Sequence, residues 1–208
     1  VDSPVHLVEI PAEGLSAAKA YHVLTHAVAP RPIAWITTLH DGVVNAAPFS
    51  WFQAICADPP MVMVSIVDKE GGVLKDTARN ALASQEFVVN IATGEQLQAL
   101  VDTSQELPPD RSELDVLGLG TVPSHAVAPP RIEDCAAHLE CRLVEHHRYG
   151  RDKATTVLIG EVLHVAMRDD LLTARGMLDG SKAQLPARLG GTSYLKVGAL
   201  EELRRSDS

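Results

Sequence analysis

The fold is decided by residues 33–50, which read IAWITTLHDGVVNAAPFS. The first part, Ile33 to Leu39, is rich in β-branched and aromatic residues, and these favour strands. Asp41-Gly42 follows, and this pair is a strong hairpin signal because glycine accepts a positive φ angle at no steric cost. Val43 then begins the return strand. The stretch therefore predicts two antiparallel strands joined by a tight turn.

Four more segments have strand character. Met61 to Val67 is apolar at nearly every position, which suits a strand buried on both faces. Residues 135–147 alternate between apolar and polar side chains, which is typical of a strand with one face in solvent. The predicted strands, in chain order, are Ile33–Leu39, Val43 onward, Met61–Val67, Glu86–Ile91, Cys135–His147 and Thr155–Arg168.

Short helices are predicted between these strands. We expect them at Ala17–Leu24, Asp76–Ser84, Gly94–Thr103 and Arg111–Leu117. Asp76 or Thr77 is expected to cap the second helix, and Thr93 with Gln96 forms a capping-box pattern before the third. The connections are of the hairpin type, without regular strand–helix–strand alternation. This organisation favours an α+β fold built on an antiparallel six-stranded β-barrel with short peripheral helices.

Length and composition limit the classes of protein that remain. The chain has 208 residues, which predicts one domain over residues 1–208. Its net charge of −9 argues against nucleic-acid binding, because no excess of Lys and Arg is available to neutralise phosphates. Three cysteines do not resemble a disulfide framework and favour a reducing compartment. No stretch reaches the ~18 apolar residues of a membrane span, so we expect a cytoplasmic protein without a membrane partner.

Several familiar site patterns are not supported by the sequence. Cys135, His138 and Cys141 suggest metal ligands, but a strand places position 138 on the face opposite to the two cysteines. Structural zinc sites usually contain closely spaced cysteine pairs, so we expect no metal here. The sequence also lacks the G-x-G-x-x-G, G-x-x-x-x-G-K and G-x-S-x-G patterns. Nucleotide-binding and hydrolase folds of those types are therefore not predicted.

Two other segments are better candidates for ligand contacts. Residues 45–50 combine small side chains, which let a ligand approach the backbone, with hydrogen-bonding groups at Asn45 and Ser50. The packing needs of a return strand explain the same residues equally well. Residues 75–77 precede a predicted helix, whose N-terminus presents free N–H groups to a phosphate. An ordinary helix cap is the alternative there. A single strand histidine such as His164 is more often structural than catalytic.

Together these segments resemble the flavin reductase-like, FMN-binding split-barrel proteins. The resemblance spans roughly residues 20–195, and the ordered set of motifs is more specific than any one of them. The residues that carry it are Arg31–Thr38, Asp41-Gly42, Asn45–Ser50, Asp58-Pro59-Pro60, Lys75-Asp76-Thr77, Arg79-Asn80, Glu86–Asn90, Gly160–Val162, Ala187–Gly191 and Tyr194.

This resemblance implies a split β-barrel with FMN bound at a homodimer interface. Backbone groups of residues 35–38 would border the isoalloxazine ring, and residues 45–50 would contact the ribityl chain and phosphate. Lys75 and Thr77 would complete the phosphate site, with Arg31 adding charge. The implied FMN-binding residues are Arg31, Trp35, Ile36, Thr37, Thr38, Asn45, Ala46, Ala47, Phe49, Ser50, Lys75 and Thr77. Tyr149, His164 and Arg188 are candidates for the substrate side.

One departure from the family pattern leaves two functions open. Short-chain flavin reductases often carry a Gly-Asp-His motif that is tied to nicotinamide handling, whereas residues 149–153 here read YGRDK. The chain therefore resembles the flavoredoxin-like branch more closely, and NAD(P)H use is open. The first function is an FMN-binding oxidoreductase that moves electrons from NAD(P)H or another donor to flavin or an acceptor. The second is a non-catalytic flavin-binding or electron-carrier protein that serves a redox partner protein. A third class of function is that of a barrel which has lost its cofactor and serves only as an interaction module.

Overall fold

The hairpin predicted from residues 33–50 is present in the computed structural model, which describes residues 5–151 and 153–203. β2 (Ala34–His40) and β3 (Val43–Phe49) pair antiparallel along their whole length. The turn residues Asp41 and Gly42 have φ angles of 49° and 80°. These values belong to the left-handed region that a two-residue type I′ turn requires. The turn thus fixes the register of the two strands.

The main sheet has seven antiparallel strands, one more than the six predicted. Their order is β3-β2-β6-β9-β10-β5-β4. The unpredicted strand is β4 (Phe52–Ala57), which lies at the edge of the sheet and is almost entirely exposed. Its sequence therefore lacks the alternation that signals a half-buried strand. The remaining strands are β5 (Pro60–Val67), β6 (Glu86–Ile91), β9 (Ala137–Tyr149) and β10 (Thr155–Met167).

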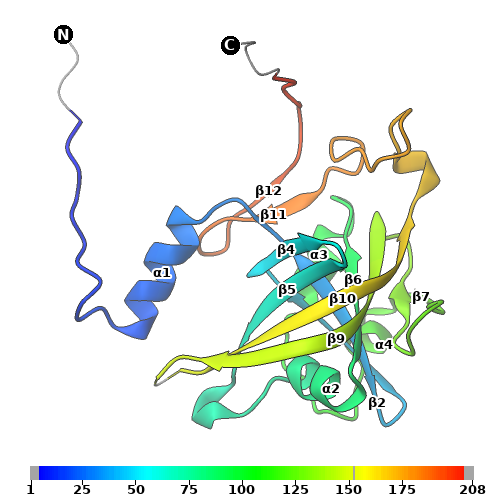
Figure 1. Ribbon diagram of the computed structural model, residues 1–208, viewed down its shortest axis with the longest axis horizontal. Coiled ribbons are helices and arrows are strands. Elements are labelled where there is room, and N and C mark those ends of the chain that lie inside the picture. Colours follow the sequence, from blue (N-terminus) through cyan, green and yellow to red (C-terminus); the bar gives the residue numbers. More distant parts are fainter. Residues whose placement is uncertain (1–4, 152, 204–208) are drawn as a thin grey trace.

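The sheet curls until its two edge strands are joined by the chain itself. β3 and β4 stand at opposite ends of the sheet order, yet only Ser50 and Trp51 separate them in sequence. The N–H of Ser65 on β5 donates to the carbonyl of Trp51 at 2.8 Å and ties this connection to the far edge. Figure 1 shows the resulting barrel, with α2 (Asp76–Ser84) at its lower end and the β9–β10 hairpin projecting to one side.

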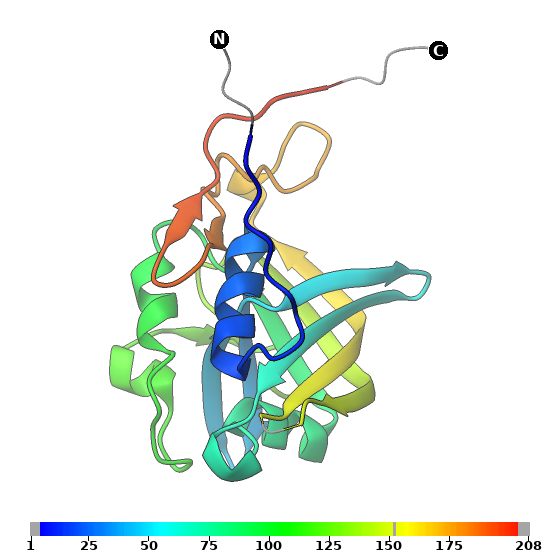
Figure 2. The same cartoon turned by 90° about the vertical axis from the view of Figure 1, so that its left-hand side faces the viewer.

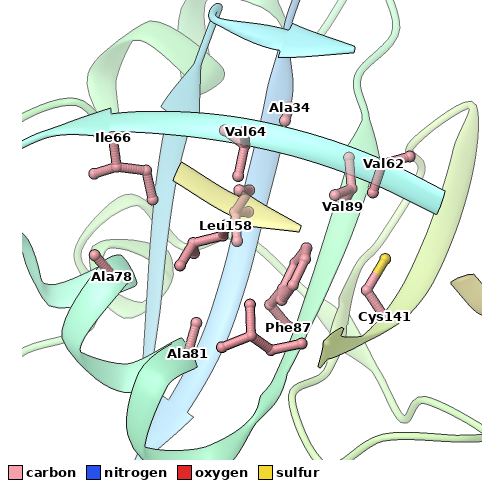
Figure 3. Packing of buried hydrophobic residues seen from close by; sticks show 12 residues of the cluster. Ala34, Val62, Val64, Ile66, Ala78, Ala81, Phe87, Val89, Cys141 and Leu158 are labelled. Carbon is pink, nitrogen blue, oxygen red and sulfur yellow. The ribbon is translucent and has the colours of Figure 1, made fainter. Parts of the chain in front are cut away.

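Apolar side chains from several strands and from α2 fill the barrel (Figure 3). Phe87 of β6 is completely buried among them. Gly160 on β10 lies directly against the Phe87 ring, and a Cβ atom at position 160 would overlap that ring. A glycine is therefore required at this position by close packing.

Short helices lie at the periphery of the barrel, as the sequence predicts. α2 has the predicted bounds, but its N-cap is Lys75 rather than Asp76 or Thr77. The reason is that the Thr77 hydroxyl donates to Asn45 and not to the helix. The other helices are α1 (Ala17–Ala27), α3 (Leu97–Asp102) and α4 (Glu113–Leu117). No helix in the described ranges is long and apolar enough to cross a membrane.

The starts of α3 and α4 fall later than predicted. α3 begins at Leu97 rather than Gly94, because residues 93–96 form a turn in which the N–H of Gln96 donates to the carbonyl of Thr93 at 3.1 Å. The Gln96 side chain accepts the N–H of Thr93 at 3.1 Å, as the capping-box pattern predicts. α4 likewise begins two residues after Arg111. Its end agrees with the prediction, since Gly118 adopts φ 67° immediately after the helix.

The prediction that one face of residues 135–147 lies in solvent is wrong at His138 and Glu140. The alternating pattern of β9 predicts His138 and Glu140 in solvent, but both are buried. Residues 121–132, which include the short strands β7 (Thr121–Val122) and β8 (Arg131–Ile132), cover this face. The backbone N–H groups of His125 and Ala126 donate to the Glu140 carboxylate at 2.9 and 2.6 Å. Alternation identifies a polar face but does not say which other segment of the chain will pack on it.

A second, three-stranded sheet lies beside α1. Its strands are β1 (Arg31–Pro32), β11 (Pro186–Arg188) and β12 (Tyr194–Lys196), in that order. Figure 2 shows α1 in front of the barrel, with β11 and β12 close to its upper end and the β4–β5 hairpin to its right. These elements surround the candidate site.

Candidate functional site

A cleft of about 300 Å³ opens between the end of α1 and the β4–β5 hairpin. It is lined by Leu24, Val28, Pro30, Arg31, Pro32, Ser50, Trp51, Phe52, Gln53, Met63 and Ser65. The lining is mostly apolar with a few polar groups, which is typical of small-ligand sites. Met63 and Ser65 are half-exposed here, so β5 is buried on one face and not on the two faces predicted.

Two buried N–H groups of cleft residues find no hydrogen-bond partner among the residues that the structure describes. They are Nε of Arg31 and Nε1 of Trp51. A buried donor left unpaired costs about 1–3 kcal/mol. The ring of Tyr21 on α1 lies parallel to that of Trp51, with 6.2 Å between ring centroids and 2° between ring planes. Two residues of the cleft lining therefore each carry an unused, buried donor, and flat aromatic side chains lie beside them.

Arg31 is only 7% exposed, and its remaining donors are used to hold α1 in place. Its guanidinium donates to the carbonyls of Thr25 at 2.6 Å, Val28 at 2.5 Å and Leu189 at 3.0 Å. These bonds join the last turn of α1 to the segment after β11. The positive charge itself meets no carboxylate within the described part of the chain.

Arg188 lies directly opposite Arg31 in the β1–β11 pair. Its guanidinium donates to the Tyr194 hydroxyl and the Gly191 carbonyl, and its central carbon is 4.3 Å from the centroid of the Tyr194 ring. Burial lowers the pKa of Arg188, and the charge of Arg31 adds to this effect. Arg31 of the cleft lining therefore has a second cation, Arg188, as its direct strand neighbour.

A network of polar side chains joins β3 to α2 and α4. Thr77 Oγ1 donates to Asn45 Oδ1 at 2.7 Å, and Asn45 Nδ2 donates to the Glu113 carboxylate at 3.0 and 3.1 Å. Glu113 also accepts the N–H of Ala46 at 2.9 Å. Burial raises the pKa of Glu113, although the hydrogen bonds it accepts oppose this shift. The network fixes the orientation of the Asn45 amide.

The start of α2 is favourable for an anion. No side chain in the described ranges caps this helix, and Lys75 occupies its N-cap position. Uncapped N–H groups and the helix dipole both attract negative charge. The adjacent Asp76 bonds Lys69 at 3.1 Å and also contacts Arg79. Burial opposes ionisation of Asp76, but these two cations outweigh it and lower its pKa.

The comparison with known families decides which kind of protein this is. The family model described as "Flavin reductase like domain" matches residues 26–184. The chain belongs to the flavin reductase-like family. This confirms the family that the sequence motifs predict.

Solved structures of similar proteins agree with this family. Nitrilotriacetate monooxygenase component B of Bacillus cereus has a TM-score of 0.90 and 31% identity, over 96% of this chain and 100% of that chain. The 2-nitrobenzoate 2-nitroreductase NbaA of Pseudomonas fluorescens has a TM-score of 0.85 and 27% identity, over 96% of both chains. Flavoredoxin of Desulfovibrio vulgaris shares the fold, with a TM-score of 0.75 and 19% identity over 97% and 98% of the chains.

The site of this flavin reductase-like chain fits the chemistry of FMN. An isoalloxazine ring is flat and carries acceptor atoms on its edge, which suits the Trp51 ring and the unpaired donors of the cleft. A phosphate suits the uncapped start of α2 and the Lys75 charge. β3 connects these two places, because Asn45 lies beside Thr77 while Ser50 lines the cleft. At ~3.3 Å per residue, Asn45 on β3 and Ser50 just after it are roughly 16 Å apart.

Several predicted FMN contacts of the flavin reductase-like pattern lie inside the barrel wall. Trp35 Nε1 donates to Thr103 Oγ1 at 2.9 Å, and Thr37 Oγ1 donates to the Pro130 carbonyl at 2.6 Å. Residues 35–37 also pair with strands on both sides. Ile36, Thr38 and Ala46 are buried as well, while Ala47 and Phe49 are half-buried. The structure thus groups Asn45 with Lys75–Thr77, and Arg31 with Ser50, but it does not bring residues 35–38 to the cleft.

The three predicted substrate-side residues do not gather in one place. Tyr149 is 61% exposed at the end of β9, and the His164 ring lies 4.8 Å from the ring of His125. Of the three, only Arg188 is paired with a residue of the cleft. Sequence reasoning missed Glu113, since its contacts with β3 span 67 and 68 residues and leave no local pattern.

Proposed function

We propose that the protein binds FMN and acts as an oxidoreductase that moves electrons from NAD(P)H or another donor to flavin or an acceptor. The observation that carries this proposal is the pair of unpaired buried donors, Arg31 Nε and Trp51 Nε1, at an apolar cleft in a flavin reductase-like chain. The relatives named as a monooxygenase component and as a nitroreductase support redox chemistry.

In this proposal, the FMN phosphate lies at the start of α2, where Lys75 and the helix N-terminus supply positive charge. Residues 45–50 run along the ribityl chain, and Glu113 positions the Asn45 amide from behind. Ser50, Trp51 and Phe52 flank the ring in the cleft. Residues 35–38 do not line this cleft, so their predicted backbone contacts with the ring are not part of this placement.

Bound FMN supplies the reversible uptake of two electrons as a hydride, which no protein side chain can offer. The chain's own residues bind and orient the ring and exclude water from it. The unpaired N–H groups of Arg31 and Trp51 would donate to its polar edge, where preorganised donors stabilise developing negative charge. Tyr149 and His164 stay candidates for the substrate side.

We further propose a homodimer that closes the open side of the cleft. The outward residues Leu163, Val165 and Met167 of β10 are 39%, 48% and 40% exposed. The N-terminal arm, residues 5–15, runs away from the barrel (Figure 1) and carries Val5, Leu7 and Val8 with exposures of 80% or more. Apolar surface of this extent on one chain is typical of a partner interface. We place this dimer in the cytoplasm, since the three cysteines are free thiols.

The test begins with the absorption spectrum of the purified full-length protein, followed by anaerobic mixing with NADH and NADPH. A bound flavin whose absorption band bleaches rapidly with a nicotinamide supports the oxidoreductase. A bound flavin that does not bleach supports the electron carrier instead. Colourless protein that takes up no FMN contradicts both functions.

A matched variant tests the cleft itself. Trp51→Phe keeps an aromatic ring but removes the unpaired N–H. We expect weaker FMN binding together with unchanged or higher stability of the flavin-free protein, because a buried unpaired donor costs about 1–3 kcal/mol. Gly198→Ala, in open space outside the cleft, is the control for binding and should leave FMN affinity unchanged. Unchanged FMN affinity in Trp51→Phe would count against this placement of the ring.

A further inference from the structure

Arg31 of the cleft lining and its strand partner Arg188 carry more positive charge than a flavin ring can neutralise. Arg31 is 7% exposed and its strand partner Arg188 is half-buried. Neither forms an ion pair with any residue between 5 and 203 that the structure describes, although the whole chain has a net charge of −9. Buried charges are normally paired, because removing them from water is costly. A neutral ring can accept a hydrogen bond from Arg31, but it leaves both charges uncompensated.

The guanidinium groups are also held in fixed positions. Arg31 bonds three backbone carbonyls, and Arg188 is fixed by Gly191 and by the Tyr194 ring at 4.3 Å. Direct pairing of β1 with β11 places the two residues opposite each other. A fixed guanidinium suits an oxyanion, which its charge attracts and its remaining N–H groups can hydrogen-bond.

We propose that Arg31 and Arg188 form a subsite for an oxyanion group of the co-substrate that exchanges electrons with the flavin. This inference rests on the proposed function and adds the class of ligand that enters the cleft beside FMN. Two sources provide the same chemistry: the pyrophosphate of a reduced nicotinamide and the carboxylate of an organic acid acceptor. The position proposed for the FMN phosphate is elsewhere, at the start of α2.

The test uses Arg188 variants of the full-length, flavin-loaded protein, because Arg31 also anchors α1 and its loss threatens folding. NADH affinity is taken from the concentration dependence of anaerobic flavin reduction. Carboxylate affinity is taken from the perturbation of the flavin spectrum by benzoate, with the uncharged benzamide as the matched probe. Arg188→Gln should weaken NADH or benzoate binding about tenfold or more, as loss of a charged hydrogen-bond donor predicts. Benzamide binding and flavin retention should not change.

Two control variants complete the design. Arg188→Lys should recover part of the affinity, because an ammonium keeps the charge but lacks the planar fork. Arg175→Gln removes an exposed arginine in the loop before β11 and should have no effect. A loss confined to NADH identifies the pyrophosphate as the ligand group, and a loss confined to benzoate identifies the carboxylate.

Two results overturn the subsite. The first is unchanged affinity for both NADH and benzoate in Arg188→Gln. The second is a loss of FMN affinity with riboflavin affinity unchanged, because the pair would then hold the flavin's own phosphate. Wild-type protein that retains no flavin contradicts the proposed function instead. In that case calorimetric titration of the same variants with NADH and benzoate still decides whether the subsite exists.

Discussion

Glu113 is a buried carboxylate whose hydrogen bonds come from Asn45 and Ala46 on β3. Burial raises its pKa in the folded protein above the ordinary value of 4.5. A raised carboxyl pKa means that the folded state binds the proton more tightly than the unfolded state. The stabilising contribution of the proton is therefore complete below pH 4.5 and is lost as the pH rises through the folded pKa.

The first prediction follows from the upward direction of the Glu113 pKa shift. Glu113→Gln keeps an oxygen for the Ala46 N–H and the Asn45 amide but does not titrate. The wild-type free energy of unfolding, taken relative to that of the variant, should therefore fall as the pH rises from 4.5 toward neutrality. Urea denaturation of both proteins between pH 4 and 7 measures this difference. Glu113→Ala leaves the two donors unpaired and should cost about 1–3 kcal/mol.

Glu106→Gln is the control for this titration, because Glu106 is exposed. Its stability relative to wild type should be the same at every pH in the range. If the difference in free energy of unfolding between wild type and Glu113→Gln also does not change with pH, then Glu113 is not desolvated as its contacts indicate.

At the scale of single residues, the sequence shows which side chains can form hydrogen bonds better than it shows what surrounds them after folding. Asn45 and Thr77 stand out as hydrogen-bonding residues in two separate motifs, and the structure joins them at 2.7 Å. The unpaired state of Arg31 Nε and Trp51 Nε1 is not visible in the sequence, since it depends on what surrounds them after folding. Glu113 is hidden for the same reason.

At the scale of elements, local signals predict local structure well. The β2–β3 hairpin follows from its Asp-Gly turn, and α2 and β6 have the predicted bounds. β4 is not predicted because an exposed edge strand does not need alternating apolar and polar residues. Its place in the sheet is determined by closure of the barrel, which the local sequence does not show. The burial of Glu140 depends on residues 121–132, which precede β9 and fold back over it.

The second prediction concerns the uncapped start of α2. Lys75 has the extended conformation of an N-cap, with φ −65° and ψ 153°, but its side chain makes no capping hydrogen bond. Lys75→Ser should stabilise the flavin-free protein by about 1 kcal/mol, because serine is a strong N-cap. The same change removes the charge proposed to bind the FMN phosphate, so FMN affinity should fall about tenfold. Denaturation and fluorescence titration measure the two effects.

Lys75→Ala separates the two causes, since alanine removes the charge without providing a cap. It should weaken FMN binding as much as serine does while bringing no gain in stability. Riboflavin, which has no phosphate, should bind all three proteins equally. Equal losses for riboflavin and FMN would place the phosphate away from α2.

At the scale of the whole molecule, two opposing properties govern association. Each chain has a net charge of −9, so two copies repel one another at long range. Each chain also exposes apolar residues on β10 and on residues 5–10, which favour contact with a second copy. The repulsion is screened by salt, whereas the apolar attraction is not weakened by it.

The third prediction is therefore a dimer that salt strengthens. Sedimentation should give a species of about 45 kDa, twice the chain mass of 22.3 kDa. Its dissociation constant should fall as ionic strength rises from 0.01 to 0.15 M, because the screening length then shortens from ~30 to ~8 Å. Val165→Glu adds a charge to the exposed face of β10 and should weaken the dimer. Ala12→Glu is the matched control, because it adds the same charge at an exposed position of the arm that has no large apolar side chain, and it should weaken the dimer less.

A monomer at every salt concentration would contradict the dimer. Dissociation of the dimer by salt would show that ion pairs rather than apolar contacts hold it.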